Sequence, residues 1–320
     1  MPSPETAAAP VPVSALPDLP NPLIRQRADP WVIRHNGSYY FMASVPEYDR
    51  LVLRSAATLG GLGSAEETVI WHRPPSGPLG GHIWAPELHH YDGQWHIYFA
   101  AGDSDDLFRI RMYVMSNPGP DPAAPAWGPP VRIETHKESF SLDATTFDHG
   151  GTRFLVWAQM DPDSSLFIAP LSSPSTLAGP PVRIADPLMD WEIKGHRVNE
   201  GPAVIERNDR IFLTFSASAT DANYCVGLLT ADSDADLLDP SSWTKSPLPV
   251  LASSDETGEY GPGHNSFTVD EAGNDVIVYH ARSERDIEGN PLHEPNRHTR
   301  IRPIVWSPEG WPRFPAPSTA

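Results

Sequence analysis

The sequence predicts an all-β protein, a five-bladed β-propeller with four antiparallel strands per blade in a single domain. A short segment that opens on an acidic residue or a histidine occurs five times. The steps between its opening residues are 58 (29 to 87), 56 (87 to 143), 57 (143 to 200) and 64 (200 to 264). Each copy runs through a turn signal into a strand rich in aromatic and β-branched residues. The 37 prolines and 23 glycines also suit short strands joined by turns.

Each blade is expected to begin at one of these opening residues and to continue through a hairpin. The opening residues are Asp29, Glu87, Asp143, Glu200 and His264, and the turns are Asn36-Gly37, Asp92-Gly93, His149-Gly150-Gly151, Asn208-Asp209 and Gly273-Asn274. The expected strands are 29–34, 39–44, 51–55 and 69–73; then 87–91, 94–100, 110–115 and 131–133; then 143–147, 152–158, 166–171 and 182–184; then 200–204, 210–215, 225–230 and 248–251; and finally 264–268, 275–280 and 300–306. The pattern does not indicate which strand closes the ring.

The chain divides into a short leader and the propeller. Residues 1–20 are rich in Ala and Pro and are expected to be a disordered leader, and residues 21–320 to form the catalytic propeller domain. The leader lacks the basic and apolar regions of a secretory signal, so we expect a cytoplasmic protein, or a secreted one if a native signal has been removed. The single Cys225 excludes an intramolecular disulfide.

Charge restricts the partners. With 23 basic and 41 acidic residues the net charge is −18, which argues against nucleic acid and anionic membranes and does not disfavour a neutral sugar. No stretch approaches 18 apolar residues, so no transmembrane span is expected. The oligomeric state is left open.

The opening residues carry the chemistry. Equivalent positions in successive blades converge on the propeller axis, where neighbouring carboxyls raise one another's pKa and hold at least one of them protonated. A protonated carboxylic acid beside an ionised one is suited to cleave a glycosidic bond. Each residue taken singly could instead be an ordinary turn former or strand cap, but five in register make coincidence unlikely.

The sequence resembles glycoside hydrolase family 43, five-bladed propellers that include arabinofuranosidases, arabinanases and β-xylosidases. The resemblance covers about residues 21–314. The motifs that carry it are Ala28-Asp29-Pro30, Trp84-Ala85-Pro86-Glu87, Leu142-Asp143-Ala144, Asn199-Glu200-Gly201-Pro202 and Gly263-His264-Asn265. Each motif is weak alone, and five in order at blade spacing are specific.

The resemblance implies an inverting mechanism. Asp29 matches the general base, Glu200 the general acid, and Asp143 the third carboxylate that orients the acid and keeps its pKa raised. Inversion requires the base and the acid to be about 6.5–9.5 Å apart, so that water fits between them. Facing blades can supply that gap.

The remaining site residues are assigned by the same resemblance. Arg297 matches an arginine beside the catalytic carboxylates, although the nearby Arg300 fits the pattern too. Trp84 and Glu87 are placed in the substrate-binding set, with blade core as the alternative for Trp84. His264 lies where the family often has a central hydrated cation, commonly calcium. Because calcium prefers about 6–8 oxygen ligands, most of its shell would be water; the alternative is a histidine bonded to an axial carboxylate without a metal.

The resemblance favours an exo-acting α-L-arabinofuranosidase that releases terminal L-arabinofuranose from plant-cell-wall α-1,5-arabinan or arabino-oligosaccharides. Family β-xylosidases usually carry an appended β-sandwich, and none is expected after Phe314. The alternatives are a β-xylosidase or mixed-specificity enzyme, and a non-catalytic sugar-binding propeller. The Pro/Gly-rich loops 74–81, 118–130 and 286–296 are candidates for the pocket rim, with a plain blade connector favoured for 118–130.

Overall fold

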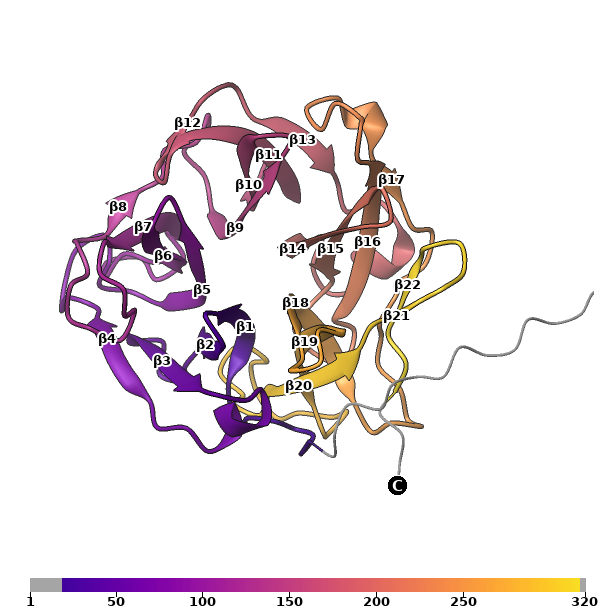
Figure 1. Ribbon diagram of the computed structural model, residues 1–320, viewed down its shortest axis with the longest axis horizontal. Coiled ribbons are helices and arrows are strands. Elements are labelled where there is room, and N and C mark those ends of the chain that lie inside the picture. Colours follow the sequence, from indigo (N-terminus) through magenta and orange to yellow (C-terminus); the bar gives the residue numbers. More distant parts are fainter. Residues whose placement is uncertain (1–18, 317–320) are drawn as a thin grey trace, which may run out of the picture.

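The computed structural model describes residues 19–316, which form five blades around a central axis (Figure 1). The predicted five-bladed propeller is confirmed. Most of the leader, residues 1–18, lies outside the described residues, as do residues 317–320. Within 19–316, no helix has the length and apolar character to cross a membrane.

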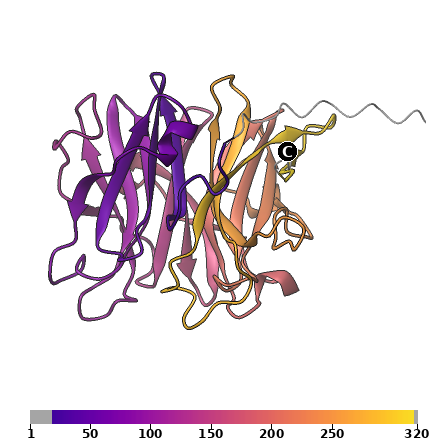
Figure 2. The same cartoon turned by 90° about the horizontal axis from the view of Figure 1, so that it is seen from below.

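The strand closest to the axis is the first strand of each blade, as the view down the ring shows (Figure 1). These five inner strands are β1 (Ala28–His35), β5 (Ile83–Tyr91), β9 (Ser141–His149), β14 (Asn199–Arg207) and β18 (Tyr260–Val269). Seen from the side, the blades stand roughly parallel to the axis, with connecting loops gathered at both ends (Figure 2).

The other strands follow outward in antiparallel order. The second strands are β2 (Ser38–Ser44), β6 (Gln94–Ala101), β10 (Thr152–Met160), β15 (Arg210–Ala217) and β19 (Asp275–Arg282). The third strands are β3 (Arg50–Ala56), β7 (Arg111–Asn117), β11 (Ser164–Ser173), β16 (Cys225–Asp232) and β20 (His298–Pro303). The outer strands of the first four blades are β4 (Thr68–His72), β8 (Val131–Arg132), β13 (Val182–Ala185) and β17 (Thr244–Lys245).

Short accessory elements complete the chain. β12 (Thr176–Leu177) pairs with β11, and β21 (Val305–Trp306) pairs with β22 (Pro312–Arg313) outside the blades. The 3-10 helices are η1 (Gly60–Gly63), η2 (Asp190–Glu192) and η3 (Pro240–Ser242).

The predicted hairpin turns form where the sequence places them. In the first four blades two consecutive turn residues have positive φ, which are 49° and 80° at Asn36-Gly37 and 50° and 72° at Asp92-Gly93. Two positive φ angles are the signature of the type I′ turn, whose twist matches the flanking strands. Asn, Asp and Gly adopt this conformation readily, which is why the sequence signal was reliable.

Two predicted outer strands are wrong. Residues 248–251 were expected to edge the fourth blade, but the outer strand is β17, and Leu251 forms only an isolated bridge with Val226. Pro247 and Pro249 have no N–H to donate, so a regular ladder cannot form there. In the fifth blade the expected strand 300–306 is divided between β20 and β21, and only β20 belongs to the blade.

The start of the described chain closes the ring. Ile24 forms an antiparallel bridge with Thr299 on the free edge of β20, beside which the first coloured residues lie in Figure 1. The N–H of Leu23 donates to the Thr299 carbonyl at 2.9 Å, and the Thr299 N–H donates to the Ile24 carbonyl at 2.9 Å. The fifth blade therefore takes its outermost partner from the opposite end of the chain, which joins it to the first blade.

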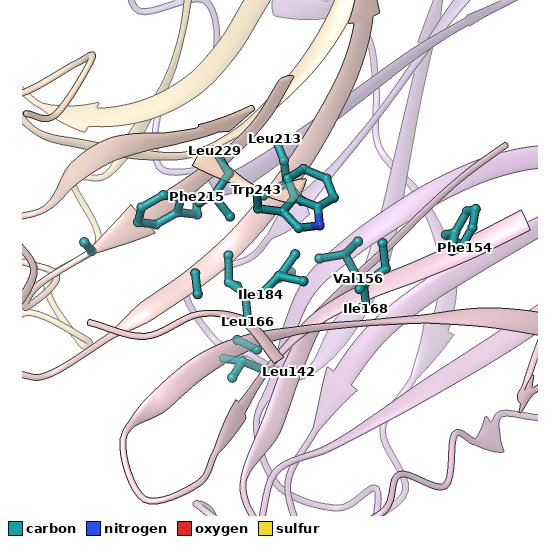
Figure 3. Packing of buried hydrophobic residues seen from close by; sticks show 14 of the residues in the cluster. Leu142, Phe154, Val156, Leu166, Ile168, Ile184, Leu213, Phe215, Leu229 and Trp243 are labelled. Carbon is teal, nitrogen blue, oxygen red and sulfur yellow. The ribbon is translucent and has the colours of Figure 1, made fainter. Parts of the chain in front are cut away.

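Five apolar clusters fill the five junctions between neighbouring blades. Figure 3 shows the junction of the third and fourth blades, where Val156, Leu166 and Ile168 face Leu213 and Trp243. The junction of the fifth and first blades contains the closing residues Leu23 and Ile24 together with Val278 and Ile301. Strands are buried on both faces here, which explains their near-continuous apolar runs.

Shortening the closing residue should weaken the whole ring. Ile24 is 3% exposed, so Ile24→Ala is expected to lower the free energy of unfolding by about 2–5 kcal/mol. Leu248, which is 68% exposed, provides the control, since Leu248→Ala should change it by about 0.5 kcal/mol or less. Denaturant unfolding of the two variants measures this difference. Equal losses of unfolding free energy would contradict the role of Ile24 in closing the ring.

Candidate active site

A β-bulge interrupts every inner strand at the same level. In each, two residues oppose one on the second strand, so that Ala28 and Trp31 pair with Ser44 and Met42 while Asp29 and Pro30 bulge out. The same shift occurs in the other four blades. The first bulged residue has positive φ throughout: 55° at Asp29, 46° at Ala85, 58° at Asp143, 54° at Gly201 and 42° at His264.

This geometry explains the residue types and corrects the repeat. Asp, His and Gly enter the left-handed region more readily than most residues, so the backbone itself favours them at the bulge. The structurally equivalent positions are thus Ala85 and Gly201, where the sequence repeat had aligned Glu87 and Glu200. Glu200 comes one residue before the first bulged residue of its strand, and Glu87 comes two residues after that of its own strand. Spacing alone could not reveal this, because all five segments have the same strand-like composition.

A pocket of about 400 Å³ lies at one end of the axis, and two positions of the inner strands line it. The first bulged residue contributes Asp29, Ala85, Asp143 and His264. The residue before the bulge contributes Trp84, Leu142 and Glu200. Arg297, which precedes β20, completes the polar wall. The structure therefore brings together all of the predicted site residues except Glu87.

Glu87 lies away from the pocket. It is 4% exposed, does not belong to the pocket lining, and its Oε2 is 2.9 Å from Nε2 of His89. Burial raises the pKa of Glu87 well above its usual value and lowers the pKa of His89 to about 3, so the pair is neutral. The structure thus places Glu87 in the packed interior of the ring, near Asp143 but not facing the cavity.

Asp29 is surrounded by hydrogen-bond donors. Ser44 Oγ donates to its Oδ2 at 2.6 Å, and Nη1 of Arg297 lies 3.4 Å from its Oδ1. Burial alone would raise the pKa of Asp29, but His264 and Arg297 outweigh it and hold the pKa well below the usual range. Asp29 is consequently a carboxylate throughout the physiological range.

The two other carboxyls respond in the opposite direction. Burial, with the negative charge of Asp29, raises the pKa of Glu200 to about 7, although a hydrogen bond from Tyr224 opposes the shift. The pKa of Asp143 is raised well above its usual value by burial and by Glu200 and Asp29. Its Oδ2 accepts the N–H of Gly201 at 2.9 Å, which ties it to the residue after Glu200.

Arg297, and not Arg300, reaches the pocket. Arg297 is 6% exposed, and its Nη2 donates to the Tyr48 hydroxyl at 2.7 Å. Arg300 points instead to Ser283 and Glu259, behind the pocket wall. Trp84 lines the cavity and stacks on His82 at a centroid distance of 5.2 Å, so it is both wall and packing.

His264 was predicted to lie beside a central calcium ion. Its Nδ1 is 3.5 Å from Oδ1 of Asp29 and 3.8 Å from Oδ2 of Asp143, so His264 lies beside both carboxyls at distances longer than the hydrogen bond that the alternative expected. Within residues 19–316, no three His, Cys, Asp or Glu side chains are arranged to hold a metal. A protein-ligated calcium ion, which needs about 6–8 oxygens, does not fit these residues. A largely water-coordinated ion stays a prediction.

Several pocket residues were not foreseen. Of the three candidate loops only 286–296 contributes, through residues 290–292, while Phe108, Phe140, His196 and Tyr224 come from segments without a sequence signal. Ser44, Ser216 and His280 do not line the pocket, but they lie at equivalent positions at or near the ends of the second strands, each paired with the residue before a bulge, and alignment of the repeats could have found them.

These strand-end residues bind the bulges across the blade junctions. Ser44 Oγ accepts the N–H of Ala85 at 2.8 Å, and Ser216 Oγ accepts that of His264 at 2.7 Å. The N–H of Asp29 donates to Nδ1 of His280 at 3.1 Å. Each bond joins one blade to the next at the level of the pocket.

Comparison with known proteins agrees with this geometry. The model of Glycosyl hydrolases family 43 matches residues 19–312. The chain belongs to this family. A family relative, the extracellular exo-alpha-(1->5)-L-arabinofuranosidase of Streptomyces avermitilis, is 52% identical over 97% of this chain and 66% of its own length. The alpha-L-arabinofuranosidase 43 of Humicola insolens is 55% identical over 93% of this chain and 63% of its own length.

The family 43 fold is also seen in solved structures. The alpha-L-arabinofuranosidase from Lactobacillus brevis superposes with a TM-score of 0.91 at 48% identity, covering 95% of this chain and 98% of its own. The chain spans just under two thirds of the length of the two curated family 43 relatives described above.

Removing the Glu200 charge should stabilise the fold in alkali. The raised pKa keeps Glu200 protonated in the folded chain while it ionises in the unfolded chain, so wild-type stability falls as pH rises from the usual 4.5 to about 7. Glu200→Gln avoids this loss. Its unfolding free energy should therefore exceed that of the wild type at pH 8, by a margin that shrinks toward pH 4.5.

Denaturant unfolding at both pH values measures the margin. The exposed Glu284→Gln is the matched control and should show no such pH-dependent margin. A constant margin for Glu200→Gln would contradict the raised pKa.

Proposed function

We propose that the protein is an inverting, exo-acting glycoside hydrolase that releases terminal L-arabinofuranose from α-1,5-arabinan and arabino-oligosaccharides. The observation that carries the proposal is the separation of carboxyl pKa values in one pocket, with Asp29 held ionised and the pKa of Glu200 raised to about 7. The identity of the released sugar is proposed from membership of family 43 and from the relatives that are named as arabinofuranosidases.

The proposed mechanism gives each carboxyl one task. Asp29 accepts a proton from water as the water oxygen bonds to the anomeric carbon. Glu200 donates its proton to the glycosidic oxygen as the bond to that carbon breaks, so the sugar leaves with inverted configuration. Arg297 keeps Asp29 ionised, the negative charge of Asp29 helps to raise the pKa of Glu200, and Asp143 accepts the N–H of Gly201, the residue after the acid.

We propose attack at chain ends because the Streptomyces avermitilis relative is named as exo-acting. Phe108, Phe140, His196 and Leu292 line the pocket together with the carboxyls. Trp84 and Leu142 supply apolar surface for one face of the sugar.

We also propose that the protein acts outside the cell, which is the secreted alternative of the sequence analysis. The Streptomyces avermitilis relative is named as extracellular, and arabinan is an extracellular polymer. The expected cytoplasmic location is therefore the less favoured of the two.

A substrate panel with two variants tests the function. The wild type is expected to release arabinose from linear arabinan and 4-nitrophenyl α-L-arabinofuranoside, and NMR of the first product should show inverted configuration. Asp29→Asn and Glu200→Gln should each lower kcat on arabinan by about 10²- to 10⁴-fold, because each removes one proton-transfer group.

Other outcomes would favour the alternative functions. Preference for 4-nitrophenyl β-D-xyloside would favour a β-xylosidase. Sugar binding without turnover on the whole panel would favour the non-catalytic propeller. Wild-type activity in Glu200→Gln would contradict the acid assignment.

The pH dependence follows from the two pKa shifts. Glu200 must be protonated to act, so kcat/KM should fall with a midpoint near pH 7 as the solution becomes alkaline. Asp29 must be ionised, and because its pKa is lowered, activity should persist to pH values below its ordinary 3.8 as long as the fold survives. Initial rates between pH 3 and 9 measure both limbs; a loss of activity centred near pH 5 on the acid side would contradict the Asp29 assignment.

A further inference from the structure

Tyr224 makes a contact with the acid that the mechanism above leaves unused. It immediately precedes β16, is 1% exposed and lines the pocket. Its hydroxyl donates to Oε1 of Glu200 at 2.7 Å. Burial and the neighbouring carboxylates raise the pKa of Tyr224 well above its usual value, so the phenol keeps its proton and can donate a hydrogen bond to Glu200.

The Tyr224 ring is held by the strand that supports the base. It stacks on His280 of β19 with a centroid distance of 5.6 Å and an interplanar angle of 1°. His280 in turn accepts the N–H of Asp29. The phenol therefore lies in a rigid stack that links the proposed acid to the backbone of the proposed base.

A glycine makes this stack possible. A Cβ on Gly263 would come within 2.2 Å of Cε1 and 2.3 Å of Cδ1 of Tyr224. These distances are far shorter than van der Waals contact, and both partners are buried in a close-packed region. Gly263 thus has a local reason to be glycine that does not involve its own backbone angles.

We propose that Tyr224 is a positioning residue for the general acid, holding Oε1 of Glu200 so that the transferable proton sits on Oε2 and faces the glycosidic oxygen. The proposal rests on the proposed function. In the step, the proton on Oε2 passes to the glycosidic oxygen, which takes the electron pair of its broken bond to the anomeric carbon. The new carboxylate keeps the Tyr224 hydrogen bond, which stabilises the charge that develops there.

Other charged and titratable groups also face Glu200. Asp29 comes from β1, Asp143 from β9, His264 from β18, and Arg297 and His196 from loops that line the same pocket. Tyr224→Phe leaves all of these in place and keeps the ring that stacks on His280. The variant therefore isolates the hydroxyl, whose hydrogen bond lowers the pKa of Glu200.

The test compares wild type and Tyr224→Phe on two substrates. With α-1,5-arabinobiose, whose leaving group needs protonation, kcat/KM should fall by about tenfold or more, the usual effect of losing a hydrogen bond to a charged group. With 4-nitrophenyl α-L-arabinofuranoside, whose leaving group needs little protonation, the fall should be clearly smaller. The alkaline limb of the pH profile should move to higher pH, because the hydrogen bond no longer lowers the pKa of Glu200.

Tyr279→Phe is the matched control. Tyr279 is also buried in the ring, and its hydroxyl donates to a carboxylate, Oε2 of Glu259, at 2.7 Å, but it does not line the pocket. Tyr279→Phe should lower the melting temperature and leave unchanged both the ratio of kcat/KM on the two substrates and the alkaline limb of the pH profile. Gly263→Ala, which displaces the Tyr224 ring, should reproduce the limb shift and provides a second variant if Tyr224→Phe does not fold.

Two outcomes separate this inference from the function on which it rests. In the first outcome, Glu200→Gln loses activity selectively on arabinobiose, while Tyr224→Phe and Gly263→Ala keep the wild-type substrate ratio and alkaline limb. The positioning role of Tyr224 is then overturned, and the assignment of Glu200 as the acid stands. In the second outcome, Glu200→Gln keeps wild-type activity on arabinobiose, which contradicts the proposed function itself.

Discussion

The pocket depends on hydrogen bonds that cross from one blade to the next at the bulges. A bulge takes backbone N–H groups out of the strand ladder, and a buried N–H without a partner is unfavourable by about 1–3 kcal/mol. Here the N–H groups of Ala85, Gly201, His264 and Asp29 find partners on the preceding blade. Apolar packing between blades is tolerant of small sliding motions, whereas these directional bonds set the height at which the inner strands meet.

The same bonds connect the fold to the chemistry. Ser44 accepts the N–H of Ala85 and donates to Asp29, and Asp143 accepts the N–H of Gly201 and lines the same pocket as Glu200. Because Ser44 and Asp143 each bind a bulge N–H and also lie beside a catalytic carboxyl, a substitution at either residue should change both the placement of the inner strands and the pKa of that carboxyl. The pocket thereby holds two carboxyls in opposite protonation states, because Arg297 lies 3.4 Å from Asp29, whereas the hydrogen-bond partner of the Glu200 carboxyl among residues 19–316 is a neutral phenol.

Ring closure is the second condition for the site, since all five inner strands meet only in a closed ring. Main-chain bonds from Leu23 and Ile24 to Thr299 are reinforced by a buried ionic group beneath them. Glu259 accepts from Asn21 at 3.2 Å, from Arg302 at 2.5 Å and from Tyr279 at 2.7 Å. The carboxylate is thus fully paired, as a buried charge must be, and it ties the first described residues to the last blade.

The architecture could be read from the sequence because its signals are local. The Asn-Gly and Asp-Gly turns select one hairpin geometry, and the aromatic and β-branched runs after them have no alternative at that spacing. The failures were local too. Pro247 and Pro249 exclude a ladder at 248–251, a rule that could have been applied to the sequence, whereas the division of 300–306 between two sheets follows from packing.

The sequence by itself determined the family, the five inner strands and the candidates Asp29, Asp143, Glu200 and His264, because these residues lie in motifs that recur at blade spacing and match the family pattern. Only the tertiary structure decided that Glu87 leaves the pocket, that Arg297 rather than Arg300 enters it, and that Tyr224 and His280 stand behind the acid and the base. A shift of one residue in a strand reverses the direction of a side chain. Such a shift changes no composition, turn or spacing, so it becomes visible only when strands from distant parts of the chain are paired.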